Sequence, residues 1–217
     1  MRVSTCSAIV VSALAVLLTA DAGWAQKWEV GAGGGGSFYK SQTVTNGSAN
    51  GSAGFSNGFV ATAILGQNLY RHLSGEIRYT YGRNDLKLAS GGAKATFAGQ
   101  SHALCYEFLV HSAPVAAKVR PYVAAGGGFK MYQGTGTETT FQNLSSLALL
   151  TRTQEWKGLL TFGGGVKYRV SKRALLRVEV RDYFTQFPTR VIQPNRGSKI
   201  GGWIHNFVAM AGLTFLF

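Results

Sequence analysis

The fold is decided by residues 203–217, which read WIHNFVAMAGLTFLF. From Phe207 onward, one alternate set of side chains is bulky and ends with Phe215 and Phe217, whereas the intervening set is smaller. Alternation with a period of two is the pattern of a β-strand with two unlike faces. We therefore predict that the sequence ends in a strand with one strongly apolar face.

The amino end has the pattern of a secretory signal peptide. Arg2 supplies a short positive segment, residues 8–20 (AIVVSALAVLLTA) are apolar, and residues 23–25 (GWA) match a small-x-small cleavage site. The apolar run is shorter than the roughly 20 residues that a transmembrane helix needs. We expect residues 1–25 to be removed, which leaves residues 26–217 as a single exported domain.

The composition is strongly basic, with 22 Lys+Arg against 9 Asp+Glu and a formal net charge of +13. The basic residues are scattered among predicted strands and turns, without a basic helix or an aromatic RNA-binding motif, so we do not expect a nucleic-acid partner. Anionic lipid headgroups and lipopolysaccharide phosphates fit this charge better. Removal of the signal takes Cys6 away and leaves Cys105 without a disulfide partner in the mature chain.

Seven further segments of strand length precede the terminal one. We predict these strands at 28–39, within 55–70, and at 73–82, 94–110, 120–133, 154–170 and 174–187. The connections alternate between long polar loops, at 40–54, 83–93, 134–153 and 188–202, and short turns, at 71–73, 111–119 and 171–173. Long loops at one end and short turns at the other are typical of an up-and-down β-barrel that spans a membrane.

The predicted strands carry their charges on one face. In the segment 174–187, for example, Leu176, Val178 and Val180 alternate with Arg177 and Glu179. A charged side chain that faces lipid costs about 2–4 kcal/mol at the bilayer midplane, so we predict that the charges point inward and the apolar residues outward. A soluble barrel of the lipocalin type would have the opposite polarity, and the period alone does not distinguish the two. The signal peptide, the apolar carboxyl end and the aromatic residues favour the membrane barrel.

Aromatic residues are predicted near both ends of the strands. Those near the short turns are Trp28, Tyr70, Tyr168 and Phe217, and those near the long loops are Tyr81, Trp156, Tyr183 and Trp203. Two such girdles are expected where a barrel crosses the two membrane–water interfaces.

The inward charges are the main candidate site. They are Glu29, Glu76, Arg78, Glu107, Lys167, Arg169, Arg177, Glu179 and Arg181. The interior of an eight-stranded barrel is only wide enough for its side chains to fill, so we expect these groups to pair and close the lumen. Inward glycines, among them Gly163 and Gly165, leave room for the long side chains. The alternative is a solvated interior with unpaired charges.

Taken together, these features resemble the small OmpA-like and opacity-type outer-membrane barrels of bacteria over essentially all of residues 26–217. The resemblance implies an eight-stranded antiparallel barrel, integral to the outer membrane and monomeric, with its termini on the periplasmic side. It also implies that Phe215 and Phe217 belong to an insertion signal for the barrel-assembly machinery. A structural or surface-interaction role is implied as well: envelope integrity, adhesion or lipopolysaccharide contact.

Arg190, Arg196 and Lys199 lie in the last long loop, and we predict that they contact lipopolysaccharide phosphates through charge-assisted hydrogen bonds. The alternative function is a narrow passive channel for small solutes.

A lipid-modifying enzyme is a third hypothesis, because the lipid A deacylases are also small barrels. Their His-x-Ser-Asn pattern is not found in this sequence. His72 and His111 fall in short turns, while His102 and His205 fall on predicted strands four apart in the ring. These histidines therefore do not converge, and we expect no catalytic site, no metal site and no cofactor.

Overall fold

The computed structural model describes residues 27–47, 49–139 and 141–217. The predicted signal peptide, residues 1–25, lies outside the described residues. In the part that is described, no helix is both long and apolar enough to cross a bilayer. The long strands are β1 (Trp28–Tyr39), β4 (Gly58–Asn68), β5 (Leu73–Arg83), β8 (Gly99–His111), β9 (Val119–Gly134), β11 (Gln154–Arg169), β12 (Ala174–Gln186) and β14 (Trp203–Leu216).

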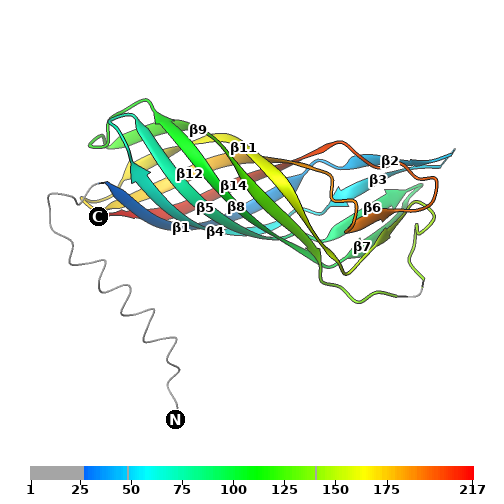
Figure 1. The fold of residues 1–217 in the computed structure, drawn as a ribbon. Helices are drawn as coiled ribbons and strands as arrows, with labels where there is room; N and C mark the ends of the chain where they lie inside the picture. The colour runs from blue at the N-terminus through cyan, green and yellow to red at the C-terminus, as the bar shows by residue number, and fades with distance from the viewer. Residues whose placement is uncertain (1–26, 48, 140) are drawn as a thin grey trace, which may run out of the picture.

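These eight long strands close into a barrel in the order β1-β14-β12-β11-β9-β8-β5-β4, as Figure 1 shows. Each strand is antiparallel to both of its neighbours. The first and last strands close the ring: Gly33 lies opposite Gly212, and Trp28 and Phe217 exchange two backbone hydrogen bonds of 3.1 Å. The prediction of an eight-stranded antiparallel up-and-down barrel is confirmed.

Six additional strands are found among the described residues, five of them in segments predicted as polar loops and one, β7, mostly within the predicted strand 94–110. They are β2 (Gln42–Asn46), β3 (Ala49–Phe55), β6 (Leu86–Ser90), β7 (Ala93–Phe97), β10 (Ala148–Leu150) and β13 (Ile192–Pro194). The strands β2-β3-β6-β7 form one sheet and β10-β13 a second, and Figure 1 shows them beyond one end of the barrel. The predicted strand 94–110 is therefore wrong at its start, because residues 93–97 pair with β6 and β8 begins only at Gly99.

The six short strands and their connections enclose an apolar core, and we call this folded part the cap. Its buried side chains include Val44, Phe55, Leu88, Val191 and Ile192. Leu88 is fully buried, as is Leu86 two positions before it, while Lys87 between them is only partly buried. A short alternation of this kind gives each strand one apolar face, and the apolar faces meet.

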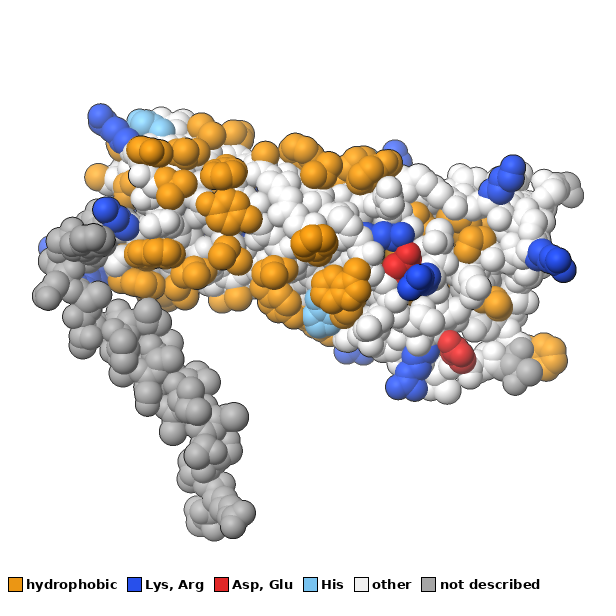
Figure 2. Space-filling view, in the orientation of Figure 1, with side chains coloured by type: hydrophobic (Ala, Val, Ile, Leu, Met, Phe, Trp, Pro, Cys, Tyr) orange, Lys and Arg blue, Asp and Glu red, His pale blue; other side chains and the backbone are white. Residues whose placement is uncertain are grey.

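A belt of exposed apolar side chains surrounds the barrel. Val123 is 64% exposed and Phe129 is 63% exposed, and both lie on the face of β9 that points away from the lumen. Figure 2 shows such side chains gathered over the barrel section, whereas fewer of them and several Lys and Arg side chains appear over the cap. The predicted inside and outside faces are thereby confirmed. One girdle assignment is wrong: Tyr183 is 1% exposed and contacts Thr80 inside the barrel, because it shares the inward parity of Arg181.

Candidate functional site

A cluster of three arginines and three glutamates fills the middle of the lumen. Arg78, on β5, contacts carboxylates from three strands. Its Nη2 lies 2.6 Å from Glu76 Oε1 on β5, its Nε lies 3.5 Å from Glu107 Oε2 on β8, and its Nη1 donates to Glu179 on β12. The guanidinium therefore ties β5, β8 and β12 together across the interior.

Arg177 and Arg181, both on β12, complete the cluster. Arg177 Nη2 lies 2.7 Å from Glu76 Oε2, and Arg177 Nε lies 2.9 Å from Glu179 Oε2. Arg181 Nε lies 3.0 Å from Glu107 Oε2. All six side chains are at most 1% exposed. Three cations thus face three anions away from solvent, which is the condition under which buried charges are tolerated.

Tyr122, on β9, belongs to the same cluster, although sequence reasoning missed it. Its hydroxyl donates to Glu179, and Arg177 Nε donates to the Tyr122 oxygen at 3.2 Å. Tyr122 is two positions from Arg120, which is also inward, so the period of two along β9 contained the signal for both.

A second layer lies nearer the short turns. Lys167 Nζ is 2.6 Å from Glu29 Oε2, and Asn68 Nδ2 donates to Glu29 Oε1 at 3.0 Å. Arg120 Nη1 donates to Asn68 Oδ1 at 2.8 Å. Arg169 does not join either layer: its guanidinium donates to backbone carbonyl oxygens in the two short turns around it.

Inward glycines provide the space that these side chains occupy. A Cβ atom placed on Gly163 would lie 2.8 Å from Arg181 Cδ. A Cβ atom placed on Gly165 would lie 2.7 Å from Glu179 Cβ and 2.8 Å from the Tyr122 hydroxyl oxygen. Any larger residue at these positions would push into the charge cluster.

Polar and apolar layers fill the lumen between the charge cluster and the cap. Thr80 contacts the hydroxyl of Tyr183 at 3.0 Å, and Met210 belongs to a buried apolar cluster at this level. Nearer the cap, Lys130 Nζ donates to Asn206 Oδ1 at 2.6 Å. Sequence reasoning did not single out Lys130, which is 2% exposed.

The loop cations Arg190, Arg196 and Lys199 are all exposed on the cap. The backbone of Arg190 bonds to the carboxylate of Glu155, and the backbone of Lys199 pairs with Thr45 of β2. These contacts fix the backbone at Arg190 and Lys199, and all three side chains are exposed.

The four histidines do not meet at one site, and His111 Nε2 lies 3.1 Å from the hydroxyl oxygen of Ser74. His102 on β8 and His205 on β14 are separated by three strands in the ring, as expected. His72 contacts the backbone of His111 near the short turns. Among the described residues, no group of three metal-ligating side chains converges.

No protein-family model and no curated protein sequence matches the chain. Solved structures are similar to it. Neisserial surface protein A (NspA) has 12% sequence identity and a TM-score of 0.55, with 88% of this chain and 97% of that chain covered. The outer-membrane protein AlkL, solved in lipid bilayers, has 14% identity and a TM-score of 0.50, with 92% and 94% covered. This likeness shows the fold. The fold and the apolar belt together make the chain an integral outer-membrane β-barrel.

Proposed function

We propose that this barrel is closed and has a structural or surface-interaction role in the outer membrane. The observation that supports the proposal is the charge cluster in the middle of the lumen, which consists of Arg78, Arg177, Arg181, Glu76, Glu107 and Glu179. Each charge in it has a partner of opposite sign. A continuous water path along the axis would have to separate these paired side chains, which lie at hydrogen-bonding distance from one another.

The cap supports the same proposal from the other end. Its apolar core packs above the lumen and includes Tyr132 of β9 and Ile204 of β14, which continue into the barrel wall. Near the short turns, a cavity beside Glu29 and Lys167 has a volume of only about 10 Å³, which is the space of roughly one water molecule.

Single-channel recording tests the closed lumen. Purified protein refolded into a planar bilayer should give no steady openings at moderate voltage. Steady openings of uniform size in the wild type would replace this proposal with the narrow-channel alternative.

We further propose that Arg190, Arg196 and Lys199 contact lipopolysaccharide phosphates. Their exposed cationic side chains on the cap support this, since Lys and Arg bind phosphate through charge-assisted hydrogen bonds. The triple variant Arg190→Gln, Arg196→Gln, Lys199→Gln should co-purify with less lipopolysaccharide, and its binding should depend less on salt.

The matched control neutralises three exposed cations near the short turns, Lys118, Lys172 and Arg173. It changes the net charge by the same amount at the opposite end of the barrel. Equal lipopolysaccharide loss in both triple variants would show that net charge, and not this loop, governs binding.

A further inference from the structure

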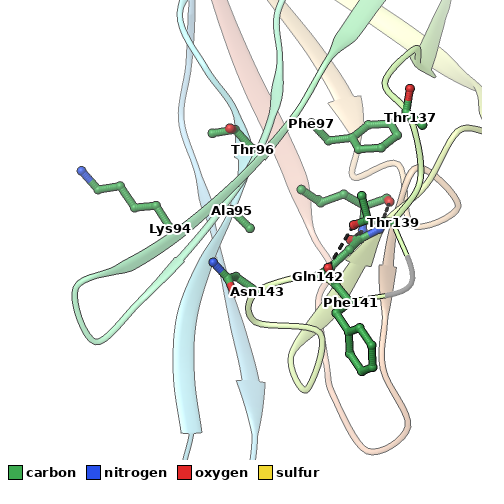
Figure 3. A pocket seen from close by; sticks show the side chains of 10 residues that line it. Lys94, Ala95, Thr96, Phe97, Thr137, Thr139, Phe141, Gln142 and Asn143 are labelled. Atoms are coloured by element: carbon green, nitrogen blue, oxygen red, sulfur yellow. Dashed lines mark hydrogen bonds between the residues drawn. The ribbon is translucent and has the colours of Figure 1, made fainter.

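The strand β7 leaves one edge of the cap sheet open. Among the described residues β7 pairs with β6 alone, and its other edge faces the segment that follows β9. Between them lies a cavity of about 330 Å³, lined by residues 94–97 of β7 and by residues 137, 139 and 141–143 of the segment (Figure 3). We call this cavity the slot.

The turn between β6 and β7 determines which backbone groups face the slot. Gly91 and Gly92 form the two-residue turn, and both have positive φ, at 56° and 86°. Positive φ at both central residues is typical of a type I′ hairpin. In such a hairpin the flanking residues, here Ser90 and Ala93, exchange both backbone hydrogen bonds.

The alternation of an antiparallel ladder extends this assignment along β7. Ala95 and Phe97 bond to β6 as Ala93 does, because bonded pairs recur at every second residue. The N–H and C=O groups of Lys94 and Thr96 therefore point to the open edge. They form a row of two donors and two acceptors with the spacing of a strand.

The slot lies where the next strand of a continuous sheet would lie. The carbonyl of Ala98 accepts hydrogen bonds from Thr135 N at 2.7 Å and from Gly136 N at 3.2 Å, so the pairing between β8 and β9 reaches just beyond β8. Beyond Gly136 the chain no longer pairs with the sheet. The backbone N–H and C=O groups of Lys94 and Thr96 therefore face the slot and not a neighbouring strand.

We propose that the slot binds an extended peptide segment of a partner protein, which adds a strand to the open edge of β7. Strand addition to an exposed edge is a recurrent mode of peptide recognition, in which backbone hydrogen bonds supply affinity and alternate side chains supply specificity. The inference rests on the proposed surface role and names the class of partner.

The side chains of β7 define the peptide sequence that fits. Lys94 and Thr96 project from one side of the strand and Ala95 and Phe97 from the other (Figure 3). Lys94 is exposed, and Lys87 of β6 lies across the ladder from Thr96 on the same side. Residues opposite each other on one face of a sheet interact, so the peptide carries an acidic side chain on the lysine side. The peptide residue that follows the acidic one points to the opposite side of the strand, where it is apolar and packs beside Phe97.

The dimensions favour a single strand over a second copy of this chain. The wall opposite β7, which includes Gln142, is held in place because the Gln142 side chain exchanges two hydrogen bonds with the backbone of Leu150, at 2.9 and 3.0 Å. A second copy would bring its whole sheet against that wall. The volume of about 330 Å³ is at the lower end of the range of roughly 300–1,000 Å³ for ligand pockets, which suits a short segment.

The test uses peptides selected from a random heptapeptide library on wild-type protein in detergent micelles. Thr96→Pro removes the N–H that faces the slot while leaving the bonds to β6 in place, because that N–H is not part of the ladder. Thr96→Val keeps the N–H and removes only the hydroxyl. Synthetic versions of the selected peptides should bind Thr96→Pro about tenfold more weakly or worse, and bind Thr96→Val as they bind the wild type.

A second arm needs no variant. Methylation of alternate backbone nitrogens of a selected peptide removes its strand-pairing donors without changing its side chains, and it should abolish binding. Lys94→Ala should weaken binding of acidic peptides and reduce its salt dependence.

Three results would overturn the inference. They are a selection that yields no binder, binders that ignore both Thr96→Pro and backbone methylation, and dimerisation of the wild type that Thr96→Pro abolishes. Steady channel openings would refute the closed barrel but would not change the measured peptide binding. The two proposals are therefore tested independently.

Discussion

Replacing Arg177 by alanine is the sharpest test of the lumen cluster. The guanidinium contacts Glu76 at 2.7 Å and Glu179 at 2.9 Å, and it donates to the Tyr122 oxygen at 3.2 Å. Its side chain is 1% exposed, so water does not compensate the loss. Truncation leaves two arginines against three glutamates in a closed space.

Removing one partner of a buried charge pair costs about 3–5 kcal/mol. We expect Arg177→Ala to lower the free energy of unfolding by an amount near the lower end of that range, because Arg78 and Arg181 still contact the stranded carboxylates. Urea unfolding in lipid vesicles, followed by tryptophan fluorescence, measures this change. Current across a planar bilayer should rise if water enters around the unpaired charge.

Two further variants make the result interpretable. Arg173→Ala removes an exposed arginine from a short turn and should change the unfolding free energy by no more than about 0.5 kcal/mol. The double variant Arg177→Met, Glu76→Gln restores equal numbers of opposite charges and should recover part of the loss. The reasoning is refuted if Arg177→Ala matches the wild type in both unfolding free energy and current.

Two other predictions rest on packing, and a third on the expected insertion signal. Gly165→Ala should destabilise the barrel in urea, since its Cβ would lie 2.8 Å or less from lumen atoms, whereas Gly158→Ala on the same strand, with open space around it, should not. Leu88→Ala should lower the stability of the cap by about 2–5 kcal/mol and make the cap sensitive to limited proteolysis while the barrel stays folded. The control Phe141→Ala, at a 92% exposed position, should leave the digestion pattern unchanged. Phe217→Asp should reduce the heat-modifiable, folded fraction in the outer membrane, and undiminished folding would count against an insertion signal at this residue.

The period of two made the barrel strands predictable. In β12, for example, Leu176 and Val178 face outward while Arg177 and Glu179 face inward, as the sequence indicated. Because successive side chains of a strand point to opposite faces, one inward assignment fixes all the others on that strand. Tyr183 was assigned to an aromatic girdle because of its residue type. It lies two positions after the inward-facing Arg181, however, and therefore points into the barrel.

The cap could not be read from the sequence. Its strands are short and lie in segments rich in Gly, Ser, Thr and Asn, where two or three apolar residues, such as Val191 and Ile192, carry no visible period. A strand of this length gains stability only from its neighbours. Long-range pairing between β3 and β6, and between β10 and β13, therefore decided that these loops fold.

By itself, the sequence determined the number of barrel strands, their apolar outer face and the charge of the lumen, because these depend on local alternation and on the cost of placing a charge in lipid. The tertiary structure alone decided that Arg78 contacts carboxylates from three strands, that Tyr122 bonds to Glu179 and Lys130 to Asn206, and that β7 keeps an open edge. The physical reason is that the register and closure of the barrel set the depth of each side chain, and depth determines which residues of different strands meet.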